Sequence, residues 1–259
     1  MERSRKPWWW LGLLCALGIP EAANAQATGQ LWGTATLDYL ASERLTYQLE
    51  LEPKSQIVVH TRQPTWFDLH TTPHVDYAVA PWIDVLGEVD IAFMNQSTEV
   101  NTTRVAPRVG AQLHILSRII QAHTAEHGAA REKLPARRPI ISTLLRLEQE
   151  STFYSTDAPS KSSWTLRDRL DFMYPLNRPK TTVDGCLYIT SDGELFIPID
   201  NSEKGGAVSE LLIRAGLGFR QSFAFRFEAL YLWDGKRNAD SGVLAPQYHG
   251  INVRVKFQF

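Results

Sequence analysis

The sequence predicts an all-β fold, an antiparallel and closed transmembrane β-barrel, on three observations. The last residues, 251–259, place apolar side chains at odd positions and polar ones at even positions, and they end on an aromatic residue, Phe259. The same alternation, which separates the two faces of a strand, recurs through most of the chain. No apolar run beyond residue 25 approaches the ~18 residues that identify a membrane-spanning helix. A barrel escapes that test, because each of its strands carries only a weak alternating signal.

The N-terminal residues have the composition of a signal peptide. A basic stretch contains Arg3, Arg5 and Lys6. The apolar run that follows, 8–19, is too short to cross a bilayer as a helix, which takes ~20 residues. Ala23 and Ala25 then form a small-residue cleavage site. We expect residues 1–25 to be removed on export, leaving one domain at 26–259; a membrane anchor or a buried helix is the alternative interpretation of the run.

Composition excludes several classes of protein. Removal of residues 1–25 would also remove Cys15, so Cys186 would be the one remaining cysteine and no internal disulfide could form. The formal net charge of −1 gives no general attraction to nucleic acid, and we expect no nucleic-acid partner. These properties fit a single exported domain without a disulfide scaffold.

The first half of the domain divides into six expected strands. Apolar side chains at every second position, such as Leu45, Tyr47 and Leu49, alternate with polar ones in the second strand. The fourth strand sets Val75 and Tyr77 against histidine and aspartate side chains, and the fifth continues the pattern. The six expected strands are 31–40, 43–52, 56–62, 66–80, 82–96 and 101–115.

The second half supplies six more expected strands, with the clearest alternation toward the C-terminus. Leu217 and Phe219 alternate with glycine and arginine, and Phe225 and Phe227 alternate with arginine and glutamate. The expected strands are 138–154, 162–176, 184–198, 207–221, 222–234 and 247–259. The total is about 12 strands, and ten is the alternative because 56–62 is short. An even number would place both ends of the domain on the periplasmic side.

Residues 116–137 interrupt the strand pattern. Leu116, Ile119, Ile120 and His123 have helical spacing, and a charged stretch follows them. We expect a short helix or hairpin there, and strand parity places it at the periplasmic rim.

Inward-facing charges are the main candidates for a functional role. Alternation turns one set of arginines and carboxylates toward the lumen: Arg146, Glu148, Glu150, Arg167, Arg169, Asp171, Arg214, Arg226, Glu228 and Arg254. The two neighbouring strands at 138–154 and 162–176 are expected to form a ladder of opposite charges. The earlier strands carry mostly acidic inward residues, so the interior is expected to be acidic on one side and basic on the other.

This charged interior has two interpretations, which stay open. In the first, a water-filled lumen orients polar or anionic solutes, and the arginines select them. In the second, the charges pair and fill the interior as a polar core. About 12 strands lie between the filled eight-stranded barrels and the open porins.

Aromatic side chains fall near the ends of many expected strands, where they are typical of interfacial girdles. The set comprises Trp32, Tyr39, Trp66, Trp82, Trp164, Tyr174, Trp233 and Phe259. The alternative is ordinary core packing in a soluble β-sandwich.

The sequence carries no recognisable enzyme motif. None of the histidines lies in a nucleophile motif, and there is no GxSxG, P-loop, Rossmann glycine pattern or CxxC. His70 and His74 share a strand face with Asp68 and Asp76, so a metal or acid–base site is conceivable there, although solvated lumen groups are the more common arrangement. We name no catalytic residue, metal ligand or cofactor.

Several short motifs resemble those of a known family. In order they are Leu145-Arg-Leu-Glu-Gln-Glu150, Leu166-Arg-Asp-Arg-Leu-Asp171, Gly193-Glu-Leu-Phe196 and Arg214-Ala-Gly-Leu-Gly-Phe219, followed by an aromatic hairpin that ends at Trp233. The chain resembles the DUF2490 family of bacterial outer-membrane β-barrel proteins of unknown function. The resemblance implies a fold and a compartment and no activity.

These features together predict a protein of the Gram-negative outer membrane, exported through the periplasm after signal-peptide cleavage. We expect its partners to be outer-membrane lipid and the barrel assembly machinery, which would recognise the last strand and Phe259. We expect either a small, porin-like channel for polar or anionic solutes or a structural envelope protein with a charge-filled lumen. The alternatives are a barrel-embedded lipid hydrolase or deacylase, and a protein that binds partners through its long loops at 155–163, 200–208 and 234–247.

Overall fold

The computed structural model describes residues 28–58, 66–96, 100–115, 139–200, 208–238 and 242–259. The predicted signal peptide and the predicted helix or hairpin at 116–137 lie outside these described residues. Within them the protein is all-β, with eleven strands and no helix. The strands are β1 (Thr28–Leu40), β2 (Leu45–Val58), β3 (Trp66–Ala80), β4 (Ile83–Gln96), β5 (Thr102–His114), β6 (Ile140–Tyr154), β7 (Lys161–Pro175), β8 (Cys186–Pro198), β9 (Glu210–Ser222), β10 (Phe225–Arg237) and β11 (Leu244–Gln258).

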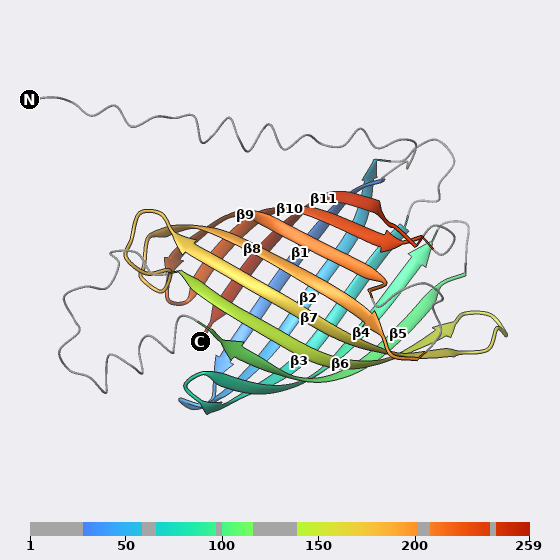
Figure 1. Cartoon of the computed structure of the whole chain (residues 1–259), viewed down its shortest axis with the longest axis horizontal. Helices are drawn as coiled ribbons and strands as arrows, with labels where there is room; N and C mark the ends of the chain where they lie inside the picture. The colour runs from blue at the N-terminus through green and yellow to red at the C-terminus, as the bar shows by residue number, and fades with distance from the viewer. Residues whose placement is uncertain (1–27, 59–65, 97–99, 116–138, 201–207, 239–241) are drawn as a thin grey trace, which may run out of the picture.

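The eleven strands close into one barrel, as predicted (Figure 1). Each strand pairs with its neighbour in sequence in antiparallel fashion, and β1 pairs with β11 to complete the circle. The β1–β11 pairing is parallel, so the barrel is mixed rather than wholly antiparallel. An odd number of up-and-down strands forces this result, since the first and last strands then run in the same direction.

Eleven strands arise where about 12 were expected because two predicted strands are one. The expected strand 43–52 and the first residues of the expected strand 56–62 belong to the continuous β2, which runs through Pro53; residues 59–62 lie outside the described part of the chain. Proline lacks a backbone N–H, and the β1–β2 pairing has a gap between the Trp32–Lys54 and Ala35–Leu51 pairs. Gly33 lies opposite this gap, where an added Cβ would come within 3.3 Å of the Pro53 ring. The missing side chain at Gly33 therefore avoids a tight contact with the proline ring where the two strands pass each other.

The barrel has two different rims. The connections at 81–82 and 223–224 are tight turns at one end, which we call the short-turn rim. Strand β11 ends at this rim, and β5 ends and β6 begins there. Strands β1 and β11 both begin at the opposite end, the loop rim, with Thr28 beside Tyr248. The start of β1 and the end of β11 thus lie at opposite rims, whereas an even number of strands would have placed them at the same one.

Side-chain burial is inverted relative to a water-soluble domain. Most of the large apolar side chains point outward, and every strand exposes some of them, including Leu31, Leu49, Phe67, Val89, Val109, Leu145, Leu170, Ile189, Leu217, Tyr231 and Ile251. The buried side chains are mostly polar or charged and point into the lumen, including Gln30, Asp68, His70, Glu88, Asp90, Arg108, Arg146, Glu148, Asp192, Glu194, Arg214 and Asn252. Water on the outside would favour the opposite arrangement. Among the described residues there is no helix long and apolar enough to cross a membrane.

Candidate functional site: the charged lumen

Five consecutive strands, β4 to β8, direct charged side chains into the lumen. Strand alternation alone sets this direction, because residues two apart share a face. On β4 and β6, for example, Glu88 and Asp90, and Arg146 and Glu148, occupy alternate buried positions. The residues between them point outward. The charges of this wall are therefore fixed on rigid strands rather than on loops.

Six of these side chains form a closed cycle of ion pairs, which we call the six-charge ring. Its members, in order of contact, are Arg108, Glu88, Arg146, Glu194, Arg167 and Glu148, which contacts Arg108 again. Every one of them has a side chain no more than 13% exposed. Positive and negative charges alternate around the cycle, so each arginine lies between two carboxylates. The ring is a circuit of contacts on one wall and not a belt around the whole lumen.

The contacts within the ring are short and directional. Arg108 donates through Nη1 to Glu88 Oε1 at 3.2 Å and through Nε to Glu148. Arg146 donates through Nη1 to Glu88 Oε1 at 2.7 Å and through Nη2 to Glu194. Arg167 donates through Nη1 to Glu148 Oε2 at 2.7 Å, and its Nε and Nη2 both lie 2.9 Å from Glu194 Oε1. Such charge-assisted hydrogen bonds are about twice as strong as neutral ones.

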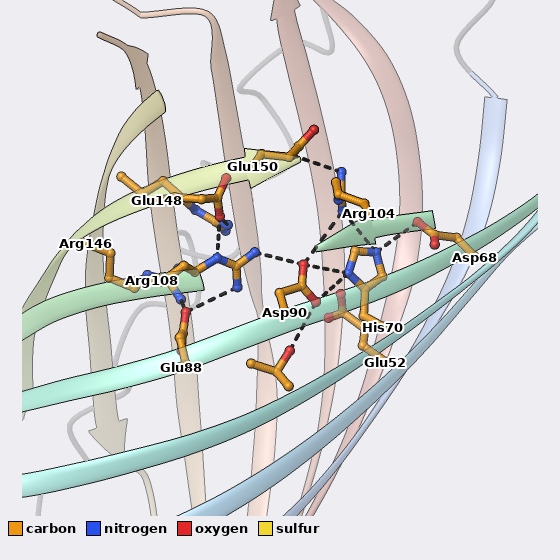
Figure 2. Close-up of polar contacts among 12 residues, drawn as sticks. Glu52, Asp68, His70, Glu88, Asp90, Arg104, Arg108, Arg146, Glu148 and Glu150 are labelled. Atoms are coloured by element: carbon orange, nitrogen blue, oxygen red, sulfur yellow. Dashed lines mark hydrogen bonds and ion pairs between the residues drawn. The ribbon is translucent and has the colours of Figure 1, made fainter. Parts of the chain in front are cut away.

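Asp90 links the ring to a histidine on the neighbouring strand (Figure 2). Its Oδ2 accepts from Arg108 Nη2 at 2.9 Å, and its Oδ1 lies 3.0 Å from His70 Nδ1. The other ring nitrogen of His70, Nε2, lies 2.9 Å from Asp68 Oδ2. Arg104 approaches both Asp90, at 3.8 Å, and Glu150, at 3.5 Å. Both nitrogens of His70 are therefore engaged by carboxylates, and neither is free to activate a hydroxyl nucleophile.

A second cluster lies nearer the short-turn rim and joins strands that are not neighbours. Asp192 on β8 accepts from Arg214 Nε at 2.6 Å and from Arg254 Nη2 at 3.0 Å. Arg254 belongs to β11, three strands away from β8, and its Nη1 lies 3.6 Å from Glu228. Tyr188 donates its hydroxyl to Glu228 at 2.8 Å. Charged side chains thus extend over the lumen from β11 to β8.

The structure brings the ten lumen candidates together in three ways. Arg146, Glu148 and Arg167 belong to the six-charge ring, and Arg214, Glu228 and Arg254 belong to the second cluster. Arg169 pairs with Asp171 on its own strand at 3.2 Å, and Glu150 pairs with Arg104. Arg226 approaches Glu228 at 4.0 Å and is the most exposed of the ten.

The predicted contact of opposite charges between β6 and β7 occurs along a diagonal, where Arg167 Nη1 lies 2.7 Å from Glu148 Oε2, and not between directly opposite residues. The register sets Arg146 directly opposite Arg167, and Glu148 opposite Thr165. Two like charges tolerate this position because Glu88, Glu148 and Glu194 surround them. The expected acidic and basic sides are also absent here, because Glu88 and Asp90 of β4 are neutralised by arginines of β5 and β6.

Several important lumen residues were missed by the sequence interpretation. Arg108 and Glu194 hold two positions of the ring. The alternation of inward and outward side chains along β5 and β8 could have identified both as lumen residues. Trp32 and Trp66, expected in an interfacial girdle, occupy inward positions of β1 and β3 and line the lumen. The sequence contained this information, because residues two apart share a face: Trp32 lies two residues before the polar Thr34, and Trp66 two residues before Asp68.

A cavity of about 860 Å³ lies between this ring and the loop rim. We call it the vestibule. Its floor includes Arg108, Arg146, Arg167 and Glu194, and its upper lining reaches Trp66, Ser209 and Gln247 at the loop-rim ends of β3, β9 and β11. Within the described part of the chain, no three His, Cys, Asp or Glu side chains are grouped as a metal ion would require.

The comparisons with known proteins are sparse. The model of the family described as "Protein of unknown function (DUF2490)" matches residues 29–242, which is most of the chain, and the protein belongs to that family. No curated protein matches the chain.

Proposed function

We propose that this member of the DUF2490 family is an outer-membrane barrel protein whose lumen is closed at mid-depth by paired charges. It would serve as a structural envelope protein with a blocked interior rather than as an open porin. The observation that carries the proposal is the six-charge ring, in which each of the three arginines is already paired with at least two carboxylates.

The outer surface supports a bilayer location. A strand of 13 residues extends ~43 Å at ~3.3 Å per residue. At a tilt of ~40° this gives a height of ~33 Å, which matches a hydrocarbon core of ~30 Å. The exposed apolar side chains around the barrel would face the lipid tails. Closure of the barrel leaves no open strand edge, so the backbone N–H and C=O groups of every strand have neighbouring strands to bond to. Hydrocarbon requires this because it offers these groups no hydrogen-bond partner.

The last strand supports assembly in the outer membrane. Phe259 is 69% exposed, and its backbone nevertheless bonds to β1 in both directions. Its N–H donates to Asp38 O at 2.9 Å, and its carbonyl accepts from Leu40 N at 3.1 Å. The C-terminal residue thus completes the seam that closes the barrel. In this proposal the short-turn rim, where β11 ends, faces the periplasm.

Pairing across the lumen supports a closed interior. The ring projects from β4–β8, the second cluster joins β11 to β8, and Glu50 of β2 lies within the electrostatic influence of Arg169 and Arg254. Releasing a buried arginine from its carboxylates leaves uncompensated charges, at a cost of ~3–5 kcal/mol. A solute entering from the loop rim would meet a floor whose charges are already satisfied.

Single-channel recording tests this proposal. The protein purified from outer membranes is placed in a planar bilayer under a salt gradient, after a heat-dependent gel shift has shown that it is folded. We expect no discrete current steps. Steps whose anion selectivity is reversed by Arg167→Glu would instead establish an open, arginine-lined channel.

Deletion of Phe259 tests the compartment separately. We expect the deletion to lower the amount of folded barrel recovered in the outer-membrane fraction several-fold, while Phe223→Ala, at an exposed aromatic position in the β9–β10 turn, leaves it unchanged. Equal recovery of the deletion variant and the full chain would argue against a membrane-assembled barrel.

A further inference from the structure

One carboxylate lies on the outer face of the barrel, among the apolar side chains. Asp168 on β7 is directly opposite Leu145 of β6 and Leu195 of β8, and strand alternation directs all three outward. Thr143 donates its hydroxyl to Asp168 Oδ1 at 2.7 Å. No described arginine, lysine or histidine forms an ion pair with Asp168, and no described residue donates to its Oδ2. The side chain is only partly buried, so a group from outside the chain can reach it.

Asp168 lies at the depth of the lipid tails in the proposed bilayer location. Trp164 and Tyr174 share its outward face on β7, four residues before it and six residues after it. At ~3.3 Å per residue and a tilt of ~40°, Trp164 lies ~10 Å nearer the loop rim and Tyr174 ~15 Å nearer the short-turn rim. Aromatic residues at strand ends are typical of the two membrane interfaces. Asp168 is therefore between the interfaces, where ionisable side chains are rare and usually have a protein partner.

The surface beside Asp168 has room for another chain. Gly193 of β8 lies directly opposite Leu170, the next outward residue of β7. A Cβ added at Gly193 would meet no atom within 4 Å, so the surface is low at this point. Small residues in membrane proteins let neighbouring segments approach closely. We call the surface formed by Thr143, Asp168, Leu170 and Gly193 the Asp168 face.

A second polar group lies on the outer face of β10 and β11. Tyr231 is 54% exposed, and its hydroxyl is hydrogen-bonded to His249 Nδ1. A tyrosine hydroxyl carries one hydrogen, and a neutral imidazole carries one N–H. The bond between the two side chains uses one of these hydrogens, so the pair keeps one free donor. Neither side chain has another hydrogen bond within the described part of the chain. We call this surface the Tyr231–His249 face.

The two faces lie at similar depths on different sides of the barrel. Asp168 lies seven residues after Lys161, where β7 begins at the loop rim, and His249 lies five residues after Leu244, where β11 begins. A difference of two residues corresponds to ~5 Å of depth. β7 is three strands from β10 and four from β11 in the circle of eleven. The outer surface therefore holds an acceptor and a donor that cannot meet within one barrel.

We propose that copies of this protein assemble head to tail in the membrane, with the Asp168 face of one copy packed on the Tyr231–His249 face of the next. The free donor of the Tyr231–His249 pair bonds to Asp168 Oδ2 of the neighbour, and the apolar side chains of both faces surround this bond. A symmetric contact of two Asp168 faces would instead bring two carboxylates together, and like charges repel strongly where the dielectric constant is low.

The angle between the two faces indicates a closed assembly. A separation of three to four strands in eleven corresponds to ~100–115° around the barrel, and a head-to-tail contact at this angle closes at roughly four to six copies. This inference goes beyond the proposed function and rests only on its bilayer location.

Disulfide cross-linking in isolated outer membranes tests the contact. Tagged copies with Asp168→Cys and untagged copies with His249→Cys are expressed together. The native Cys186 is fully buried, so the introduced thiols are the reactive ones. We expect a disulfide-linked product of a tagged and an untagged copy, several-fold more abundant than any product of either variant expressed alone. Thr71→Cys, at an outward position of β3, replaces His249→Cys as the control and should give no product.

Two results of the cross-linking would overturn the proposal. Efficient cross-linking of Asp168→Cys to itself would establish a symmetric dimer instead of the head-to-tail contact. Absence of any cross-linked product from folded protein in the outer-membrane fraction would show that the two faces do not meet.

Substitutions that remove the polar groups give an independent test. Asp168→Leu and His249→Phe should each lower the assembled fraction on native gels several-fold, whereas Thr71→Val should leave it unchanged. We expect Asp168→Leu to leave the amount of folded barrel intact, because leucine suits a face in contact with lipid. Equal assembly of Asp168→Leu and the unaltered chain would overturn the proposal.

The outcome is separable from that of the proposed function. A protein that conducts and gives the expected cross-link would keep the interface between copies and lose the closed lumen. A silent, folded protein in the outer membrane that gives no cross-link would keep the closed lumen and lose the interface.

Discussion

The two walls of the lumen follow the same alternation and differ in how their polar atoms are satisfied. On β4–β8, six charges satisfy one another in a closed cycle. On β10, β11 and β1–β3, Gln30, Gln56, Asp68 and Asp234 each keep a buried side-chain atom without a hydrogen-bond partner in the protein. The charges of the first wall stabilise one another, whereas the second wall keeps polar atoms that no protein atom satisfies. Inward polarity alone therefore does not tell how well a lumen side chain is satisfied; the pairing of each atom does.

The largest expected effect breaks the paired wall. Arg146→Ala removes a guanidinium that lies between Glu88 and Glu194 and opens the ring, so that each buried carboxylate keeps only its other arginine, Arg108 or Arg167. We expect the free energy of unfolding to fall by about 3–5 kcal/mol, measured by urea titration of the detergent-folded barrel. As a control, Arg226→Ala removes a more exposed arginine 4.0 Å from Glu228 and should cost less than ~1 kcal/mol. Similar losses in the two variants would contradict a special role for the ring.

The second cluster should respond less strongly. Arg254 is 22% exposed and bonds to Asp192 at 3.0 Å, while Arg214 also bonds to Asp192. Because Arg214 continues to neutralise Asp192, we expect Arg254→Ala to lower the free energy of unfolding by about 2 kcal/mol. The double variant with Arg214→Ala should lose more than the sum of the single variants. Additive losses would show that the two arginines act independently.

On the unpaired wall the expected sign is reversed. Gln56→Leu removes a buried acceptor that has no partner in the protein. We expect the free energy of unfolding to stay constant or to rise by about 1 kcal/mol. A marked destabilisation would mean that Gln56 is a structural residue.

The smallest expected effect lies at the loop rim. Lys236 pairs with Glu210 at 3.1 Å, and its side chain is 46% exposed. Water and salt screen such a pair, so Lys236→Ala should change the free energy of unfolding by less than ~1 kcal/mol. The residual effect should disappear at high salt, whereas the loss caused by Arg146→Ala should persist. A salt-independent loss at Lys236 would place this pair among the buried ones.

Much of the fold was predictable because strand alternation is a local property. The pattern from Ile251 to Phe259 predicted the last strand, and similar patterns placed most of the others. The main difference lies in one strand. Residues 43–52 and 56–62 were expected to form separate strands, whereas β2 runs from Leu45 to Val58 through Pro53, opposite Gly33. This difference changed the count by one, and the parallel β1–β11 seam follows from the odd number.

The lumen site was predictable in composition and not in connectivity. The inward direction of Arg146 and Arg167 followed from alternation, but their face-to-face position depends on the β6–β7 register. Trp32 and Trp66 were assigned to the membrane interface because tryptophan near a strand end is common there. Their parity with inward residues was the better guide, since a residue's face follows from its neighbours two positions away.

The sequence by itself determined which side chains face the lumen and which face outward, because a strand turns successive residues to opposite sides. Tertiary structure decided which of those side chains meet. Register and closure bring Glu88 of β4, Arg146 of β6 and Glu194 of β8 together, and they place Arg254 of β11 on Asp192 of β8. They also leave Gln30, Gln56, Asp68 and Asp234 without complete partners on one wall. Charge pairing acts over a few ångströms between strands far apart in the chain, and such distances exist only once the barrel has closed.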